Sequence, residues 1–158
     1  MQSSALLWPA ALDGERLMPS HNSSIEVLLV EDSPNDADLM ADALRGSALE
    51  PRVTVVEDGE EALQYLRSQG AYAAAPRPDL ILLDMQLPKV NGDEVLEELG
   101  QDSDLRRIPV VAFGTPNRKY DLDAICCVGK PGDQEEFARV VKTIEAFWLR
   151  TARRAASR

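Results

Sequence analysis

The chain has 158 residues, 44% of them hydrophobic, and its 27 acidic and 17 basic side chains give a formal net charge of −10. The apolar fraction is sufficient for the core of one domain, which excludes a chain that is disordered throughout. The excess of negative charge repels a phosphate backbone and therefore argues against direct binding of nucleic acid.

Nothing in the sequence predicts a membrane or secretory protein. No apolar run approaches the ~18 residues that a membrane-spanning helix requires. The apolar residues 5–8 lack a preceding basic segment and a cleavage site, so we expect no signal peptide. The adjacent Cys126 and Cys127 cannot form an ordinary intrachain disulfide, and we expect a cytoplasmic protein with no membrane partner.

The chain divides into a folded segment and two tails. Residues 1–24 are rich in Ser, Pro and Ala and show no periodicity, which predicts a flexible N-terminal arm; Met18 is an alternative start. The folded domain is expected over residues 25–149. Residues 150–158 form a basic C-terminal tail with four arginines, so we expect no DNA-binding effector domain after the folded part.

Five apolar runs predict strands. They begin near Glu26, Arg52, Leu80, Ile108 and Ala124. The first, third and fourth runs are almost continuously apolar, which is typical of strands buried on both faces of a parallel sheet.

Helical patterns alternate with these strands, near residues 34–44, 60–67, 92–99 and 133–148. Ser33 or Asp32 is expected to cap the first helix and Asp133 the last. This alternation predicts an α/β protein with a doubly wound parallel sheet and helices on both faces. The ten residues of segment 114–123 are too few for a crossover helix, so we expect one turn or an irregular loop there.

Charged residues follow three of the predicted strands. Glu31 and Asp32 follow the first, Asp84 ends the third and Lys130 follows the fifth. The carboxyl ends of parallel strands meet at one edge of the sheet, where ligands bind. Carboxylates brought so close repel one another unless a cation bridges them, and oxygen ligands suit Mg²⁺. A dication beside a lysine favours phosphoryl transfer, in which an aspartate can be the nucleophile.

Three segments resemble those of two-component response regulator receiver domains: Val30-Glu31-Asp32, Leu83 to Pro88 with Asn91-Gly92, and Gly129-Lys130-Pro131. The resemblance covers about residues 25–149. It implies a flavodoxin-like, five-stranded (βα)5 fold with a shortened fourth helix. Segments 31–37 and 142–148 resemble the single-domain regulators that are paired with phytochrome histidine kinases.

This resemblance assigns roles to individual residues. It makes Asp84 the phosphoacceptor, Asp32 a direct Mg²⁺ ligand and Glu31 a ligand that binds directly or through water. The backbone carbonyl of Gln86 would be a further ligand, and Lys130 would pair with the phosphoryl oxygens. It also implies a cis peptide between Lys130 and Pro131.

As a member of this family, the protein would be a single-domain response regulator that receives phosphate from a sensor histidine kinase of the phytochrome type. It would assist its own aspartyl phosphorylation without being a classical enzyme. It would signal through protein contacts or pass the phosphate on in a phosphorelay.

The switch positions depart from the family pattern. Gly114 stands where a receiver normally has Ser or Thr, which leaves open whether the neighbouring Thr115 supplies the phosphate-binding hydroxyl. Cys127 stands where an aromatic switch residue is usual. An alternative reading is therefore a degenerate receiver that docks partners constitutively. A dehalogenase-like phosphatase is disfavoured because Gln86 stands where its second acid would be.

We also expect a homodimer built from the last helix and the strand before it. The apolar stripe from Phe137 to Trp148 is wide, and Phe147 and Trp148 are the expected contact residues. The arginine-rich end could lie against the acidic body of the partner. Both cysteines are expected to be hydrophobic residues of the core strand.

Overall fold

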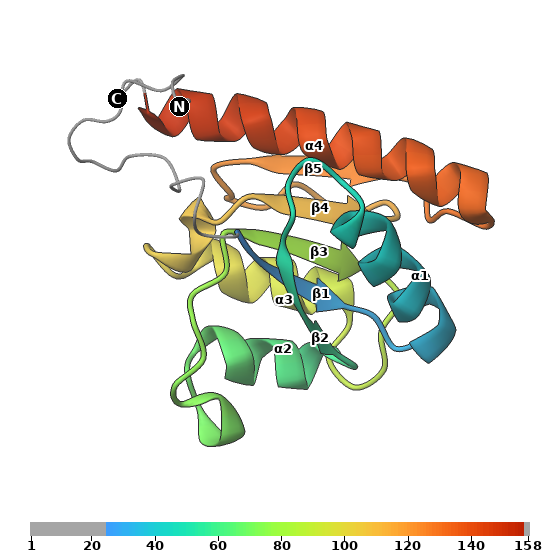
Figure 1. Cartoon of the computed structure of the whole chain (residues 1–158). Coiled ribbons are helices and arrows are strands. Elements are labelled where there is room, and N and C mark those ends of the chain that lie inside the picture. Colours follow the sequence, from blue (N-terminus) through green and yellow to red (C-terminus); the bar gives the residue numbers. More distant parts are fainter. Residues whose placement is uncertain (1–24, 157–158) are drawn as a thin grey trace.

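The computed structural model describes residues 25–156, so the predicted N-terminal arm and the end of the basic tail lie outside the described part. Five parallel strands form one sheet in the order β2-β1-β3-β4-β5 (Figure 1). The strands are β1 Glu26–Val30, β2 Arg52–Val56, β3 Leu80–Asp84, β4 Val110–Phe113 and β5 Ile125–Val128. The predicted α/β fold with a flavodoxin-like, doubly wound parallel sheet is confirmed.

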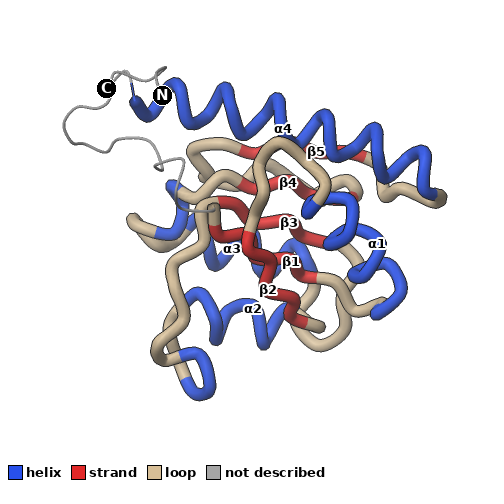
Figure 2. Tube along the Cα trace, in the orientation of Figure 1, coloured by secondary structure: helices blue, strands red, loops and turns tan. Residues whose placement is uncertain are grey.

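Helices cover both faces of the sheet (Figures 1 and 2). The core on one face includes side chains of α1 and α4, and the core on the other includes those of α2 and α3. The helices are α1 Pro34–Arg45, α2 Gly59–Leu66, α3 Gly92–Gly100 and α4 Gln134–Ala156, with short 3-10 turns at Gly70–Tyr72 and Leu105–Arg107. Because β1 and β3 lie between two layers of helices, four of the five residues of β1 and all five of β3 are buried.

Short polar side chains begin the helices, as the sequence predicts. The Ser33 hydroxyl accepts the Asp36 N–H at 3.3 Å, and Pro34 occupies the first turn of α1. Asp133 accepts the Glu136 N–H at 2.9 Å at the start of α4. These caps fix where α1 and α4 start, directly after the carboxyl ends of β1 and β5.

No helix forms between β4 and β5 in the described chain, and segment 114–124 is an irregular loop. Asp93 of α3 holds this loop, because its Oδ1 accepts the Asn117 N–H at 2.7 Å and the Tyr120 hydroxyl at 2.6 Å. The Arg118 guanidinium pairs with Glu97 and lies 4.5 Å from the centre of the Tyr120 ring. We expected a shortened fourth helix, and in the described chain an irregular loop replaces this helix entirely.

The missing helix leaves one face of β5 uncovered. Ile125 is 37% exposed and Cys127 is also exposed, whereas Cys126 points the other way and packs against the core. The prediction that both cysteines are core residues is therefore wrong for Cys127. Alternate residues of a strand face opposite sides, and only one side of β5 has a helix to cover it.

Helix α4 continues past Leu149, the predicted end of the domain, to Ala156. Phe147 and Trp148, the expected dimer contacts, are only 6% and 9% exposed and pack in the core of their own chain. Within residues 25–156, no helix combines the length and the apolar character that crossing a bilayer requires.

Candidate functional site

Three carboxylates meet at the carboxyl ends of β1 and β3. Glu31, Asp32 and Asp84 each offer an oxygen atom within 4.8 Å of the others. Glu31 and Asp84 are only 6% and 3% exposed, whereas Asp32 faces solvent. Such a group combines two fixed, buried anions with one that is open to incoming ions.

Backbone N–H groups orient the two buried carboxylates. The Ser33 N–H donates to Glu31 Oε2 at 3.1 Å, and the Gln86 N–H donates to Asp84 Oδ1 at 3.0 Å. The Met85 N–H continues the β3–β4 ladder by donating to the Phe113 carbonyl at 3.1 Å. Each carboxylate is therefore held by the chain that turns out of its own strand.

Lys130 neutralises the cluster from the end of β5. Its Nζ lies 3.0 Å from Asp84 Oδ2 and 3.1 Å from Glu31 Oε2. Burial raises the pKa of Glu31 to about 6, against the lowering effect of the Ser33 N–H and Lys130. Burial alone would lower the pKa of Lys130, but its hydrogen bonds to Asp84 and Glu31 outweigh this and raise that pKa. Lys130 therefore stays protonated at neutral pH.

A third carboxylate on Lys130 was not foreseen from the sequence. Asp36 Oδ2 lies 3.3 Å from Lys130 Nζ, which also contacts Glu31 and Asp84. In the sequence, an aspartate in the first turn of a helix indicates only a favourable interaction with the helix dipole. No periodicity signals its contact with a lysine that lies far along the chain.

The peptide between Lys130 and Pro131 is trans, since the described residues contain no cis peptide bond. The cis form implied by the family resemblance is therefore wrong for this structure. The trans form is the intrinsically preferred one before proline, and from it the lysine side chain reaches all three carboxylates.

The two ends of the connection from β3 to α3 pack tightly against each other. A Cβ on Gly92 would lie 2.6 Å from the Met85 Cα, so only glycine fits there. Asn91 caps α3 by accepting the Glu94 N–H at 3.0 Å. The carbonyl of Gln86, expected as a metal ligand, belongs to this loop.

The switch position at the end of β4 requires glycine. Gly114 has a φ of +124°, and a Cβ there would lie 3.1 Å from the Met85 Cβ. The usual Ser or Thr would be strained in this backbone conformation. Thr115 is exposed, and its hydroxyl makes no hydrogen bond to any residue that the structure describes.

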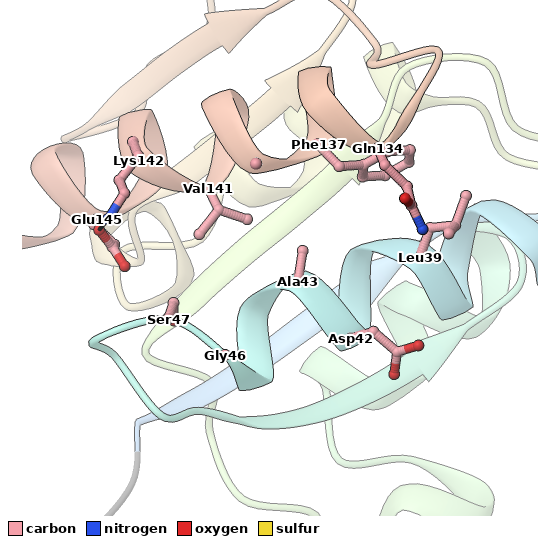
Figure 3. A pocket seen from close by; sticks show the side chains of 11 residues that line it. Leu39, Asp42, Ala43, Gly46, Ser47, Gln134, Phe137, Val141, Lys142 and Glu145 are labelled. Atoms are coloured by element: carbon pink, nitrogen blue, oxygen red, sulfur yellow. Dashed lines mark ion pairs between the residues drawn. The ribbon is translucent and has the colours of Figure 1, made fainter.

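Two hollows lie near the helices that flank the site. A small pocket of about 10 Å³ lies beside the site, and its lining includes Glu31, Asp36 and Lys130. A larger groove of about 400 Å³ separates α1 from α4 and is lined by Leu39, Ala43, Phe137 and Val141 among others (Figure 3). The larger groove contains none of the three clustered carboxylates and therefore lies apart from the carboxylate cluster.

The donor set suits a hard dication such as Mg²⁺, because it consists of carboxylate oxygens close to one another. Glu31, Asp32 and Asp84 are the residues that would hold it. The Lys130 ammonium neutralises Glu31 and Asp84, so a dication that binds these carboxylates has to displace it from them.

Comparison with known proteins identifies the same family. Residues 27–142 match the family model described as the response regulator receiver domain. Response regulator Rcp1 of Synechocystis is 40% identical over 131 residues, which cover 79% of this chain and 89% of that protein.

Solved structures of response regulators are also similar to this chain. The phosphorylated cyanobacterial phytochrome response regulator RcpA is 44% identical, with a TM-score of 0.71 over 80% of this chain and 95% of that one. The Mn²⁺-bound form of Rcp1 has 40% identity and a TM-score of 0.69 over 79% and 94%.

Proposed function

Because the chain belongs to the response regulator receiver domain family, we propose that it accepts a phosphoryl group on Asp84 from a sensor histidine kinase. The observation that carries this proposal is the pairing of buried Asp84 with Lys130 at 3.0 Å, beside two further carboxylates. Phosphorylation makes the protein a signalling intermediate and not a classical enzyme.

In the transfer, a carboxylate oxygen of Asp84 attacks the phosphorus, a P–O bond forms and the P–N bond to the kinase histidine breaks. The Gln86 N–H holds the Asp84 carboxylate in place through a hydrogen bond to its Oδ1. Lys130 gives up a carboxylate oxygen and pairs with a phosphoryl oxygen. Mg²⁺ held by Glu31, Asp32 and Asp84 would supply charge neutralisation for the phosphoryl oxygens.

We propose that the kinase is of the phytochrome type and that the encounter occurs in the cytoplasm. The similarity to RcpA, which is a phytochrome response regulator, supports this partner. Free Cys126 and Cys127 fit a reducing compartment. Phosphotransfer from a phosphorylated phytochrome kinase, compared with an unrelated histidine kinase at equal concentration, tests the partner. Equal rates from both would contradict it.

The alternative is a degenerate receiver that docks partners without phosphate. The glycine-specific backbone at Gly114 and the exposed Cys127 favour it, because neither position carries a switch side chain. Intact-mass analysis after incubation with acetyl phosphate and Mg²⁺ separates the two functions. One added phosphoryl group supports the receiver, and an unchanged mass supports the docking module.

Mg²⁺ should stabilise the protein. An ion that binds only the folded state contributes about 2.7 kcal/mol at 100 times its dissociation constant, which raises Tm by roughly 5–10 °C. Thermal unfolding with and without millimolar Mg²⁺ measures this shift. Asp32→Asn should lose most of it, whereas Asp38→Asn, on an exposed residue of α1, should keep it. A wild-type Tm indifferent to Mg²⁺ would contradict the proposed metal site.

We also propose a homodimer through the uncovered face of β5. Exposed Ile125 and Cys127 on β5 and Leu149 on α4 support it, whereas Phe147 and Trp148 are committed to the core. Sedimentation at micromolar concentration should give a dimer, and Ile125→Asp should give a monomer. Val55→Asp, at an equally exposed apolar residue of the opposite edge strand, is the control that should remain dimeric. A monomeric wild type would refute the dimer.

A further inference from the structure

Asp36 contacts the site lysine from outside the carboxylate cluster. It lies in the first turn of α1, its Oδ2 is 3.3 Å from Lys130 Nζ, and its side chain is 31% exposed. Both side chains line the pocket of about 10 Å³, which has room for about one water molecule at most. The carboxylate and the ammonium therefore face each other without a layer of bulk water between them.

The three partners of the ammonium are not equivalent. An ammonium has three N–H donors, and here carboxylates of Glu31, Asp84 and Asp36 surround it. Glu31 and Asp84 also belong to the carboxylate cluster that fits a dication, whereas Asp36 does not. A dication and the ammonium cannot both keep the same carboxylate oxygens.

We propose that Asp36 is a positioning residue, which retains the Lys130 ammonium beside Asp84 when a dication takes over the Glu31 and Asp84 carboxylates. This inference rests on the proposed function and extends it to a residue with no role there. Lys130 then stays within reach of a phosphoryl group on Asp84 and does not swing into solvent.

The energetic consequence can be derived from the number of partners. Without a dication, Asp36 is one of three anions on Lys130, and it is the most distant of them. With a dication bound, it is the one that remains, so its contribution is larger. Removing it therefore destabilises the ion-bound state more than the free state and weakens dication binding.

Calorimetric titration of the full chain with Mg²⁺, at constant pH and ionic strength, measures this effect. Asp36→Asn should bind Mg²⁺ roughly two- to fivefold more weakly than wild type, as expected for loss of one partly exposed ion pair. Asp38→Asn is the matched control, because it removes the same charge from the exposed side of the same helix. Its affinity should change by less.

Repeating the titration in the Lys130→Ala variant separates the positioning of Lys130 by Asp36 from a general effect of charge on Mg²⁺ binding. In Lys130→Ala, the additional change Asp36→Asn should weaken Mg²⁺ binding no more than Asp38→Asn does. Asp36→Glu, which keeps the charge, should bind more tightly than Asp36→Asn. Two results would overturn this inference and leave the proposed function standing. One is an equal Mg²⁺ affinity of Asp36→Asn and Asp38→Asn. The other is an equal loss of Mg²⁺ affinity on Asp36→Asn whether residue 130 is lysine or alanine. Failure of the wild type to bind Mg²⁺ would overturn both.

Discussion

Replacing Asp84 with asparagine should abolish phosphorylation of the protein. The amide has no anionic oxygen with which to attack phosphorus, and no other carboxylate of the cluster has the same position between Lys130 and the Gln86 N–H. Intact-mass analysis after incubation with acetyl phosphate and Mg²⁺ should show one phosphoryl group on the wild type and none on the variant.

Asp79→Asn is a suitable control for this experiment. Asp79 precedes β3 just as Asp84 ends it, and its Oδ2 accepts the Glu26 N–H at 2.7 Å, a bond that an asparagine oxygen can also accept. Asp79 lies at the opposite end of β3 from Asp84, so the Asp79→Asn variant should still be phosphorylated. Phosphorylation of Asp84→Asn at the wild-type level would refute the assignment of the phosphoacceptor.

Lys130→Ala should lower the free energy of unfolding of the metal-free protein. It leaves Glu31 and Asp84, both nearly buried, without the cation between them. Removing one partner of a fully buried ion pair costs about 3–5 kcal/mol. Because 36% of the Lys130 side chain is exposed, we expect a smaller loss of about 2–3 kcal/mol in the free energy of unfolding.

Mg²⁺ should recover most of this loss, since a dication neutralises the same two carboxylates without having to displace an ammonium. Urea unfolding of wild type and Lys130→Ala, with and without saturating Mg²⁺, measures both effects. Lys119→Ala, which removes an exposed lysine that forms no ion pair in the described chain, should change neither. The same destabilisation with and without Mg²⁺ would show that Lys130 does not act through the cluster.

The lysine should matter less for accepting phosphate than for holding the product. Lys130→Ala should therefore still be phosphorylated, but its phosphorylated form should lose phosphate-dependent partner binding. A variant whose phosphorylated form binds partners as the wild type does would exclude Lys130 as the phosphoryl anchor.

The sequence by itself determined the strands, the helices and the edge of the sheet where the site lies. Each rests on local information: continuous apolar runs for the buried strands, caps such as Ser33 and Asp133 for the helices. The meeting of Glu31, Asp32 and Asp84 follows from one further rule, that parallel strands end at a common edge.

Only the tertiary structure decided the features that depend on contacts between distant segments. Asp36 reaches Lys130 because α1 packs near the end of β5, and nothing local to either residue records this. Gly114 has to be glycine because its backbone adopts a φ of +124°, and Met85 lies close to the place that a Cβ would take. Cys127 is exposed, and Phe147 and Trp148 are buried, because burial depends on which faces the helices cover. A hydrophobic pattern states which side chains need cover, and only the packed chain determines which of them receive it.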